Sequence, residues 1–255
     1  MVWSRHDSRK TIRCFLSQQF GIFSFKMSRE DLLKIADARL YPSLTNPNYL
    51  VLRARRQIFA PYLQELADDL KVLDVGGRYQ PYRPLLSGKV SKYFALDVDR
   101  TEFVSVVGNG QHIPFRDGLF DLVIATGVFE YFENPHEAAR DIRRVLKPGG
   151  SLIVSVGSVV PRFVDEERWR YLPLGLTSVF SGFSQLRIAP EVLSLGGFCR
   201  LINLGFHDFL KLKPLKSVYR LSVCPVLNLV GLLLERARLT SNDKWAGNYN
   251  IIAVK

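Results

Sequence analysis

The sequence has few of the residues that build metal sites and disulfide frameworks. It holds three cysteines and four histidines among 255 residues. Cys14, Cys199 and Cys224 are scattered, odd in number and never arranged as C-x-x-C, which argues against a zinc site and is typical of a reducing compartment. The histidines show no ligand spacing either. We therefore predict a cytoplasmic protein without a metal site, and a chain of this length can be stable without one.

A secretory signal is also missing from the start of the chain. Residues 1–26 contain no continuous hydrophobic segment before a small-residue cleavage site. A transit peptide is one interpretation of this segment. Residues 27–31 (MSRED) nevertheless look like a natural start, because Ser28 can cap a helix with an acidic first turn. We favour a disordered N-terminal extension for residues 1–26.

Long apolar runs are scarce as well. Residues 221–234 are mostly apolar but are interrupted by Pro225 and Asn228, and the stretch is too short to span a bilayer. We favour a buried cap or dimer helix, and the alternative is an interfacial helix that touches anionic lipid at the membrane periphery. The alternative rests on the basic residues that flank the stretch, which are Lys211, Lys213, Lys216, Arg220, Arg236 and Arg238.

The positive charge of the chain is unevenly distributed. There are 35 basic and 24 acidic residues, for a net charge of +11. Most of the excess lies in residues 1–26 and 208–255, whereas the central part is nearly neutral. A nucleic-acid enzyme is expected to carry a basic stripe across its working face. We therefore do not expect nucleic acid as a partner.

Strand and helix patterns alternate after residue 70. Apolar runs predict strands at residues 71–75, 93–98, 120–126 and 151–157, with a short one near 103–107 and a last one at 250–255. A helix is predicted at about 135–146, between Pro135 in its first turn and the KPGG segment at 147–150. Residues 29–39 and 50–70 also have helical spacing. Apolar strands that alternate with helices predict a parallel sheet covered on both faces.

The first of these strands runs into an acid and two glycines. Residues 71–77 read KVLDVGG, and the next apolar run ends in Asp97, 23 positions after Asp74. A glycine turn at the end of a buried strand brings bare backbone to a ligand, and an acid after the next strand can accept hydrogen bonds from a ribose diol. The pair predicts an adenosine-like ligand. The G-x-G-x-x-G pattern of NAD-binding turns is absent.

Five blocks in order resemble the motifs of the class I S-adenosylmethionine-dependent methyltransferases, and of the methyltransferase type 11 group in particular. The first two are the DVGG turn and Asp97. The others are GNGQHIPF at 108–115, FDLV at 120–123 and RVLKPGG at 144–150, which resemble the family's G-D-A-x-x-L-P-F, f-D-x-V and R-x-L-K-P-G-G blocks. The resemblance covers residues 70–157. A lone glycine turn is a weak signal, whereas five blocks in order are specific.

The resemblance implies an α/β, Rossmann-like, doubly wound and mostly parallel seven-stranded sheet that binds S-adenosylmethionine. Three positions of the cofactor-binding motifs depart from the family pattern: Arg78 and Gln80 replace later glycines of the turn, and Asn109 replaces the acid that faces adenine. The side-chain oxygen of Asn109 can still accept a hydrogen bond from an amine. The implied cofactor-binding residues are Asp74, Gly76, Gly77, Asp97, Val98, Asn109, Gly110, Gln111, Thr126 and Gly127.

No catalytic base stands out in the sequence. The family's usual Glu-His pair is Glu130-Tyr131. In-line positioning of a reactive methyl group can contribute about 7–11 kcal/mol, more than the roughly 3–5 kcal/mol of a general base. An oxygen nucleophile still gains from a base, and the candidates are His112, Glu130, Tyr131 and His136. The alternative for the histidines is structural: His112 packs beside the cofactor loop, and His136 decorates the start of a helix.

A narrower resemblance follows the predicted core. WRYLPLGL at residues 169–176, LGGF at 195–198 and GRYQPYR at 77–83 are similar to segments of bacterial methyltransferases associated with polysaccharide and glycan assembly. The resemblance implies that Trp169 and Arg170 bind the acceptor, with Trp169 stacking on a sugar and Arg170 pairing with a phosphate. The alternative is a core tryptophan beside a structural ion pair.

The sequence therefore predicts a methyltransferase that acts on a small-molecule or glycan-linked acceptor, as in polysaccharide biosynthesis. The alternatives are a lipid-quinone-type small-molecule methyltransferase and a non-catalytic cofactor-binding protein. We divide the chain into the extension at 1–26, an N-terminal helical lid at 27–70 and a cofactor-binding core at 71–157. Residues 158–255 then hold an acceptor-side insertion, an apolar cap helix and the final strand.

Overall fold

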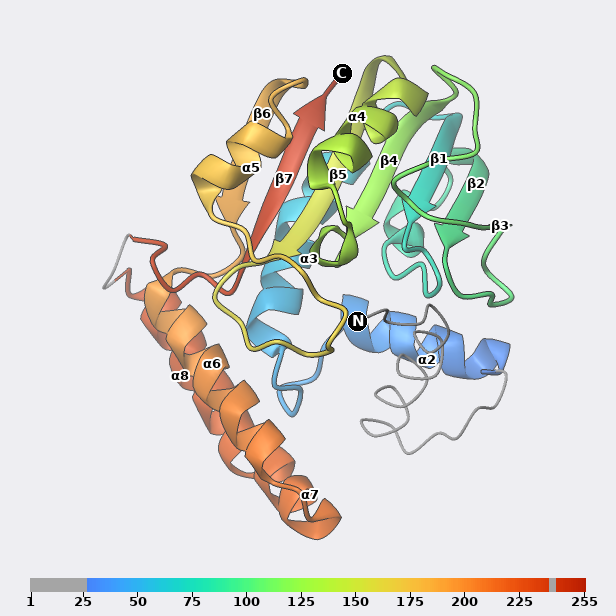
Figure 1. Cartoon of the computed structure of the whole chain (residues 1–255). Coiled ribbons are helices and arrows are strands. Elements are labelled where there is room, and N and C mark those ends of the chain that lie inside the picture. Colours follow the sequence, from blue (N-terminus) through green and yellow to red (C-terminus); the bar gives the residue numbers. More distant parts are fainter. Residues whose placement is uncertain (1–26, 239–241) are drawn as a thin grey trace, which may run out of the picture.

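A seven-stranded sheet with helices on both faces forms the body of the molecule in a computed structural model that describes residues 27–238 and 242–255 (Figure 1). The predicted extension at residues 1–26, with Cys14, lies outside the described residues. The strands are β1 (Leu70–Val75), β2 (Val90–Asp97), β3 (Val106–Val107), β4 (Phe120–Thr126), β5 (Leu146–Gly157), β6 (Ser184–Pro190) and β7 (Asn248–Val254).

The strand order is β3-β2-β1-β4-β5-β7-β6. Strands β1 to β5 are parallel to one another, and β7 lies antiparallel between β5 and β6. The prediction of a mostly parallel, Rossmann-like seven-stranded sheet is confirmed. Strand β5 begins at Leu146, earlier than predicted, because Leu146 pairs with Phe120 before a register shift. The pattern analysis missed β6, in which charged and polar residues interrupt the apolar ones.

One face of the sheet is covered by α3 (Tyr49–Glu65), with α2 (Arg29–Leu40) beside it. Phe59 and Leu63 of α3 are fully buried against Val72, Leu122 and related side chains of the central strands. A buried Phe or Leu stabilises the fold by about 1.5–3 kcal/mol. Helix α3 is thus one layer of the core, and the action of residues 27–70 as a lid stays a prediction.

The other face carries α4 (Pro135–Val145) and α5 (Pro173–Val179), together with the short 3-10 helix η2 (Phe129–Tyr131). Helix α4 begins where predicted, because Asn134 caps it by accepting from the backbone N–H of Glu137 at 3.2 Å. Its stripe of Ala138, Ile142 and Val145 is fully buried in the larger of the core clusters. The apolar spacing of this segment therefore determined both its helix and the face that it buries.

The connection from β1 to β2 contains the 3-10 helix η1 (Arg83–Leu86) and no α-helix. Pro81 and Pro84 lie in this connection. Proline lacks a backbone N–H and restricts the residue before it, so it interrupts α-helical hydrogen bonding. No helix N-terminus therefore points at the glycine turn, in contrast to dinucleotide folds that bind a pyrophosphate there.

Three helices form an arm that extends away from the sheet (Figure 1). The arm comprises residues 194–236, with α6 (Ser194–Phe209), α7 (Lys213–Leu221) and α8 (Val223–Arg236). Helices α7 and α8 are separated by Ser222 alone, so residues Lys213–Arg236 form a 24-residue stretch that is long and apolar enough to cross a membrane by length and composition. The prediction of a stretch too short to span was wrong, because the apolar face begins in α7.

Candidate active site

The carboxyl ends of β1, β2 and β4 meet at one edge of the sheet. In the parallel register Val75 lies beside both Leu96 and Ala125, so the turns after the three strands are adjacent. Gly76 has a φ of +79°, and a Cβ there would lie 2.0 Å from Cγ1 of Val128. Only glycine fits between these turns. The structure thus brings together the two glycine-containing turns at residues 76–77 and 126–127, as the sequence predicted.

Asp97 ends β2 and is buried at this edge. Its carboxylate pairs with the guanidinium of Arg78, with Oδ2 3.1 Å from Nε and Oδ1 3.1 Å from Nη2. Oδ1 also accepts from the backbone N–H of Asp99 at 3.0 Å. Arg78 continues to the carboxylate of Asp99 at 2.6 Å. Burial lowers the pKa of Arg78, but the two carboxylates raise it more, so it stays charged and its charge is balanced within the turn.

The residues at this edge fit S-adenosylmethionine. A carboxylate offers about four lone-pair positions, and Asp97 uses three of them on Arg78 and Asp99, which leaves one for a ribose hydroxyl. A Cβ at Gly77 would lie 2.8 Å from the side chain of Asp74, so bare backbone is required beside the acid. The Val98 side chain is 57% exposed next to Asp97 and offers an apolar surface to a purine.

Gln80 explains one departure from the family pattern. It has a φ of +51°, the left-handed conformation that glycine adopts without strain and other residues adopt at a cost of about 1–2 kcal/mol. Its side-chain amide donates to the carbonyl of Phe103 at 2.8 Å and accepts from Arg83 at 2.9 Å. These hydrogen bonds offset the strain, so the turn keeps a glycine-like backbone without a glycine.

Asp74 lies under the glycine turn and is buried. Its Oδ2 accepts from the hydroxyl of Tyr93 at 2.7 Å. Burial raises the pKa of Asp74 to about 7; the Tyr93 hydrogen bond lowers it and the nearby Asp97 raises it. The carboxyl is therefore poised between its neutral and charged forms near neutral pH. A positively charged ligand at this edge favours the charged form.

The loop after β3 contributes Asn109, Gly110 and Gln111. Oδ1 of Asn109 accepts from the backbone N–H of Gln111 at 3.0 Å. A Cβ at Gly110 would lie 2.6 Å from Cγ1 of Val75, which brings the backbone of this loop against the end of β1. Oε1 of the buried Gln111 accepts from the N–H of Asn134 at 2.7 Å. Gln111 thus ties the loop to the start of α4, and contact of these three residues with adenine stays a prediction.

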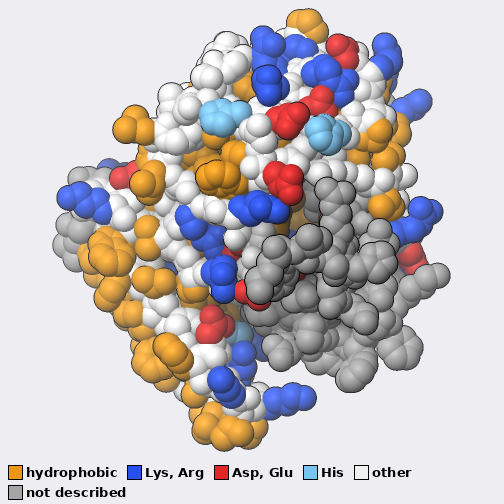
Figure 2. All heavy atoms as spheres, viewed as in Figure 1, with side chains coloured by type: hydrophobic (Ala, Val, Ile, Leu, Met, Phe, Trp, Pro, Cys, Tyr) orange, Lys and Arg blue, Asp and Glu red, His pale blue; other side chains and the backbone are white. Residues whose placement is uncertain are grey.

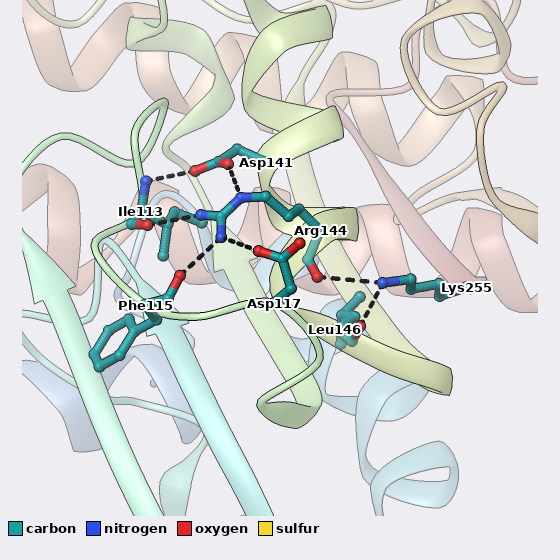
Figure 3. Close-up of polar contacts among 7 residues, drawn as sticks. All are labelled: Ile113, Phe115, Asp117, Asp141, Arg144, Leu146 and Lys255. Carbon is teal, nitrogen blue, oxygen red and sulfur yellow. Dashed lines mark hydrogen bonds and ion pairs between the residues drawn. The ribbon is translucent and has the colours of Figure 1, made fainter.

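Arg144 of the RVLKPGG block contacts the chain that follows this loop, at residues 113–117 (Figure 3). Its guanidinium donates to the carbonyls of Ile113 and Phe115, both at 2.8 Å, and pairs with Asp117 at 2.7 Å. Asp141 bridges Arg144 and the backbone N–H of Ile113, each at 2.5 Å. The block therefore fixes the β3–β4 connection against α4.

Among the four catalytic candidates, three lie on the surface. His112 and His136 are exposed, and the Tyr131 side chain is 42% exposed. Glu130 is 6% exposed, and its Oε1 accepts from the backbone N–H of Gly157 at the end of β5, at 2.6 Å. Burial raises its pKa, and backbone hydrogen bonds partly lower it. Oε2 of Glu130 is buried and has no hydrogen-bond partner in the described part of the chain.

Trp169 and Arg170 are placed by the loop that follows β5. Nε1 of Trp169 donates to the carbonyl of Phe132 at 2.7 Å, and 42% of the residue remains exposed. The guanidinium of Arg170 donates to the carbonyls of Pro161 and Trp169 and pairs with Glu167. Arg170 therefore stabilises its own loop. The N–H donors that it uses there are those that a bound phosphate would need. The stacking face of Trp169 remains available, and the roles of both residues in acceptor binding stay predictions.

Sequence analysis missed a second set of polar residues at the same edge. We call it the buried polar cluster, and it comprises Asn48, Arg55, Ser155, Glu191, Arg200, Asn248 and Asn250. Arg55 pairs with Glu191 at 2.6 Å, and the Ser155 hydroxyl donates to the same carboxylate at 2.6 Å. The carbonyl of Ser155 accepts from the N–H of Gly127 at 2.9 Å, which connects the cluster to the turn after β4.

Several atoms of the buried polar cluster are buried without a partner in residues 27–238 and 242–255. They are Nη1 of Arg200, Oδ1 of Asn248 and both polar side-chain atoms of Asn250. Burial lowers the pKa of Arg200 to about 10, although Glu191 opposes this change. Unpaired buried polar atoms cost about 1–3 kcal/mol each, so such a set indicates a place for a polar ligand or ordered water. The only sequence signal was the two asparagines in an otherwise apolar final strand.

Known proteins resemble parts of this chain. A family described as a methyltransferase domain matches residues 73–154. An uncharacterized protein of Methanocaldococcus jannaschii is 30% identical over 58% of this chain and 68% of its own length. A tRNA U34 carboxymethyltransferase of Syntrophotalea carbinolica is 26% identical over 58% of this chain, and the match spans 45% of that enzyme.

Solved structures share the fold. A SAM-dependent methyltransferase from Archaeoglobus fulgidus superposes with a TM-score of 0.51 at 14% identity, over 87% of this chain and 99% of that one. Phosphoethanolamine N-methyltransferase 2 of Haemonchus contortus, in complex with S-adenosyl-L-methionine, superposes with a TM-score of 0.54 at 14% identity, over 95% of this chain and 59% of that one.

The match to the methyltransferase domain runs from the second half of β1 through most of β5, the part of the chain that includes Asp74 and Asp97. The strand order and the bare glycine turns fit the same cofactor. The chain belongs to the class I S-adenosylmethionine-dependent methyltransferases, and S-adenosylmethionine is its cofactor.

Proposed function

We propose that this methyltransferase acts on a polar acceptor, either a small molecule or a glycan-linked group, that binds beside the ends of β5 and β7. The observation that carries the proposal is the unpartnered Nη1 of Arg200 together with the unpartnered side chains of Asn248 and Asn250. In the antiparallel register Asn250 lies beside Ser155, and Asn248 lies beside Gly157. Hydroxyl groups can pair with both the donors and the acceptors of this set, and carboxylate or phosphate oxygens can pair with its donors, whereas a lipid-quinone ring satisfies few of them.

The bound cofactor supplies an electrophilic methyl group on a sulfonium. Asp97 and the backbone at Gly76, Gly77 and Gly110 hold the adenosine part, and Asp74 lies beneath the glycine turn. In this proposal the turn after β4, at Thr126 and Gly127, contacts the methionine portion of the cofactor. Between this turn and the buried polar cluster lies the Ser155 carbonyl that accepts from Gly127. The acceptor and the methyl group are thus held on adjacent strand ends.

Orientation supplies most of the rate in this mechanism. A well-oriented nucleophile gains about 7–11 kcal/mol, compared with roughly 3–5 kcal/mol from a general base. Glu130 is the buried one of the four candidate bases; it is fixed to the end of β5 and keeps Oε2 unpaired among the described residues. Burial raises the pKa of Glu130, which makes its carboxylate a stronger proton acceptor than an exposed one.

The names of the similar proteins do not identify the acceptor of this chain. One is named for tRNA U34 and another for phosphoethanolamine. The central part of this chain is nearly neutral in its charge, which supports a small or glycan-linked acceptor over RNA. A role in polysaccharide biosynthesis, with Trp169 stacking on a sugar, belongs to this proposal.

Methyl transfer from labelled S-adenosylmethionine into fractionated cell extract tests the proposal. We expect label in the polar small-molecule or glycan fraction, followed by identification of the methylated atom by mass spectrometry. Label in the apolar lipid fraction would support the quinone-type alternative instead. Tight cofactor binding by calorimetry without transfer to any fraction would identify a non-catalytic protein. The Asp97→Ala variant serves as the control for cofactor-dependent label.

A further inference from the structure

The arm exposes a row of large apolar side chains. Phe209 at the end of α6 is 84% exposed, Leu221 at the end of α7 is 75% exposed, and Leu233 in α8 is 67% exposed. Figure 2 shows hydrophobic side chains gathered along the arm. The other large exposed apolar residues in α7 and α8 and just before them mostly follow one another at intervals of three positions and are Leu212, Leu215, Val218, Val223, Val226, Leu229 and Val230.

This spacing places the apolar residues on one face of the two helices. Only 22% of the most apolar window in Lys213–Arg236 is buried, so this face is not part of the core of the described chain. A contiguous exposed apolar surface of this kind marks an interaction site.

The arm is also basic at one end of its apolar part. Residues 209–234 contain Lys211, Lys213, Lys216 and Arg220 and no acidic residue. Basic side chains gather near the tip of the arm in Figure 2. Arg236 and Arg238 follow at the other end of α8. Apolar side chains flanked by lysine and arginine are complementary to a bilayer whose surface carries negative charge.

The arm is fixed to the body by a polar seam and by close packing. Asn228 of α8 donates to the carbonyls of Leu44 and Asn46, at 2.7 and 3.0 Å, in the connection between α2 and α3. It also accepts from Asn203 of α6 at 3.1 Å. A Cβ at Gly231 would lie 2.6 Å from Cδ1 of Leu50. The apolar face therefore has a set orientation relative to the active site.

We propose that the arm docks on the surface of an anionic lipid bilayer, with the apolar side chains of α7 and α8 at the boundary between headgroups and acyl chains. The basic residues near the tip contact lipid phosphates, and their long side chains reach the headgroups from an apolar surface. The close packing of α6 along α8 and the buried Asn228 favour a helix that lies on the membrane over one that crosses it.

A second copy of the chain fits the arm less well. A second copy would present the same apolar and basic face, with no acid among residues 209–234 to pair with the lysines and Arg220. An anionic bilayer offers both apolar acyl chains and the missing negative charge. The proposal does not rest on the identity of the methyl acceptor, because it is tested by binding alone.

Vesicle co-sedimentation of the full chain tests the proposal. We expect binding to vesicles that contain phosphatidylglycerol, weaker binding to vesicles of phosphatidylcholine alone, and loss of the difference at high salt. The Lys211→Ser, Lys213→Ser variant should bind the anionic vesicles about fivefold more weakly for each residue changed. The triple variant Val218→Ser, Leu221→Ser, Leu233→Ser should lose roughly tenfold for each side chain that enters the bilayer.

The matched control removes apolar side chains of similar exposure outside the arm. Leu33, Leu172 and Leu174 are 50%, 65% and 86% exposed, and their triple change to serine should leave vesicle binding intact. Circular dichroism and cofactor calorimetry verify that each variant is folded. Equal losses in the arm and control variants, equal binding to neutral vesicles, or no binding at all would overturn the proposal. A lipid-free dimer that the arm variant abolishes would identify a second copy as the occupant and overturn it as well.

Discussion

The cofactor edge and the buried polar cluster lie on neighbouring strand ends but are built in different ways. The cofactor edge is assembled from residues 74–128, a nearly continuous stretch in which each turn follows its own strand. The buried polar cluster draws Asn48 from the N-terminal part, Glu191 from the end of β6 and Asn250 from the last strand. A site made of consecutive strand ends leaves motifs in the sequence, whereas one made of distant single residues does not.

Loss of Asp97 should have the largest effect of the changes considered. It disrupts the cofactor edge and leaves the buried polar cluster intact. We expect Asp97→Ala to weaken S-adenosylmethionine binding about 100-fold, because a ribose acceptor is lost and Arg78 keeps a partly buried charge without its main partner. Calorimetry measures the effect. Asp99→Ala is the matched control: it removes the other carboxylate of Arg78 and should change the affinity little. Unchanged affinity in Asp97→Ala contradicts the ribose assignment.

Asn250→Leu probes the buried polar cluster alone. We expect the KM for the acceptor to rise about tenfold while the cofactor Kd is unchanged, since the side chain lies across β5 from the cofactor edge. Because both polar atoms of Asn250 are unpartnered in the described chain, the apolar variant should be at least as stable as the original. An unchanged KM, measured with the acceptor found by labelled transfer, would assign the cluster to ordered water.

The pH dependence of stability and of cofactor affinity tests the role of Asp74 at the cofactor edge. With its pKa raised to about 7 from an ordinary 3.8, folding favours the protonated carboxyl, so stability without cofactor should fall as pH rises from about 4 to 7 and then level. The cationic cofactor favours the carboxylate. Its affinity should therefore rise by up to about tenfold per pH unit below 7. Thermal unfolding and calorimetry measure the two trends, and Asp74→Asn should flatten both.

Arg144→Ala should loosen the β3–β4 connection without changing a residue assigned to cofactor binding. We expect a loss of about 1–3 kcal/mol in the free energy of unfolding and a cofactor Kd several-fold higher, because the carbonyls of Ile113 and Phe115 lose their donor. Lys255→Ala is the control, since Lys255 donates to the carbonyls of Arg144 and Leu146 at the far end of α4. A Kd raised equally by both variants would indicate a general loss of packing.

Glu130→Gln should have the smallest effect. The amide oxygen can keep the hydrogen bond from Gly157, and orientation supplies most of the rate, so we expect kcat to fall less than about tenfold. A fall of about 100-fold or more, with the loss of a pH-dependent limb in the kcat profile, would instead identify Glu130 as a general base. The pH–rate profile of both proteins decides between these roles.

The cofactor edge was largely predictable for a physical reason. Parallel strands place their carboxyl ends at one edge, so Asp74, Asp97 and Asn109 could be brought together from strand order alone. The pairing of Arg78 with Asp97 was not predictable, because it depends on the path of a turn without an α-helix. Gln80 in a left-handed conformation and the use of Arg170 within its own loop likewise depend on contacts that no spacing encodes.

Sequence alone determined the alternation of strands and helices, the cofactor and the family, because these depend on local patterns of apolar residues, acids and glycines. Tertiary structure alone decided that α7 and α8 join into one apolar face, and in which direction the arm projects. It also assembled the buried polar cluster, whose first and last members, Asn48 and Asn250, are 202 positions apart. Such features depend on which distant segments pack together, and packing is a property of the whole fold rather than of any segment within it.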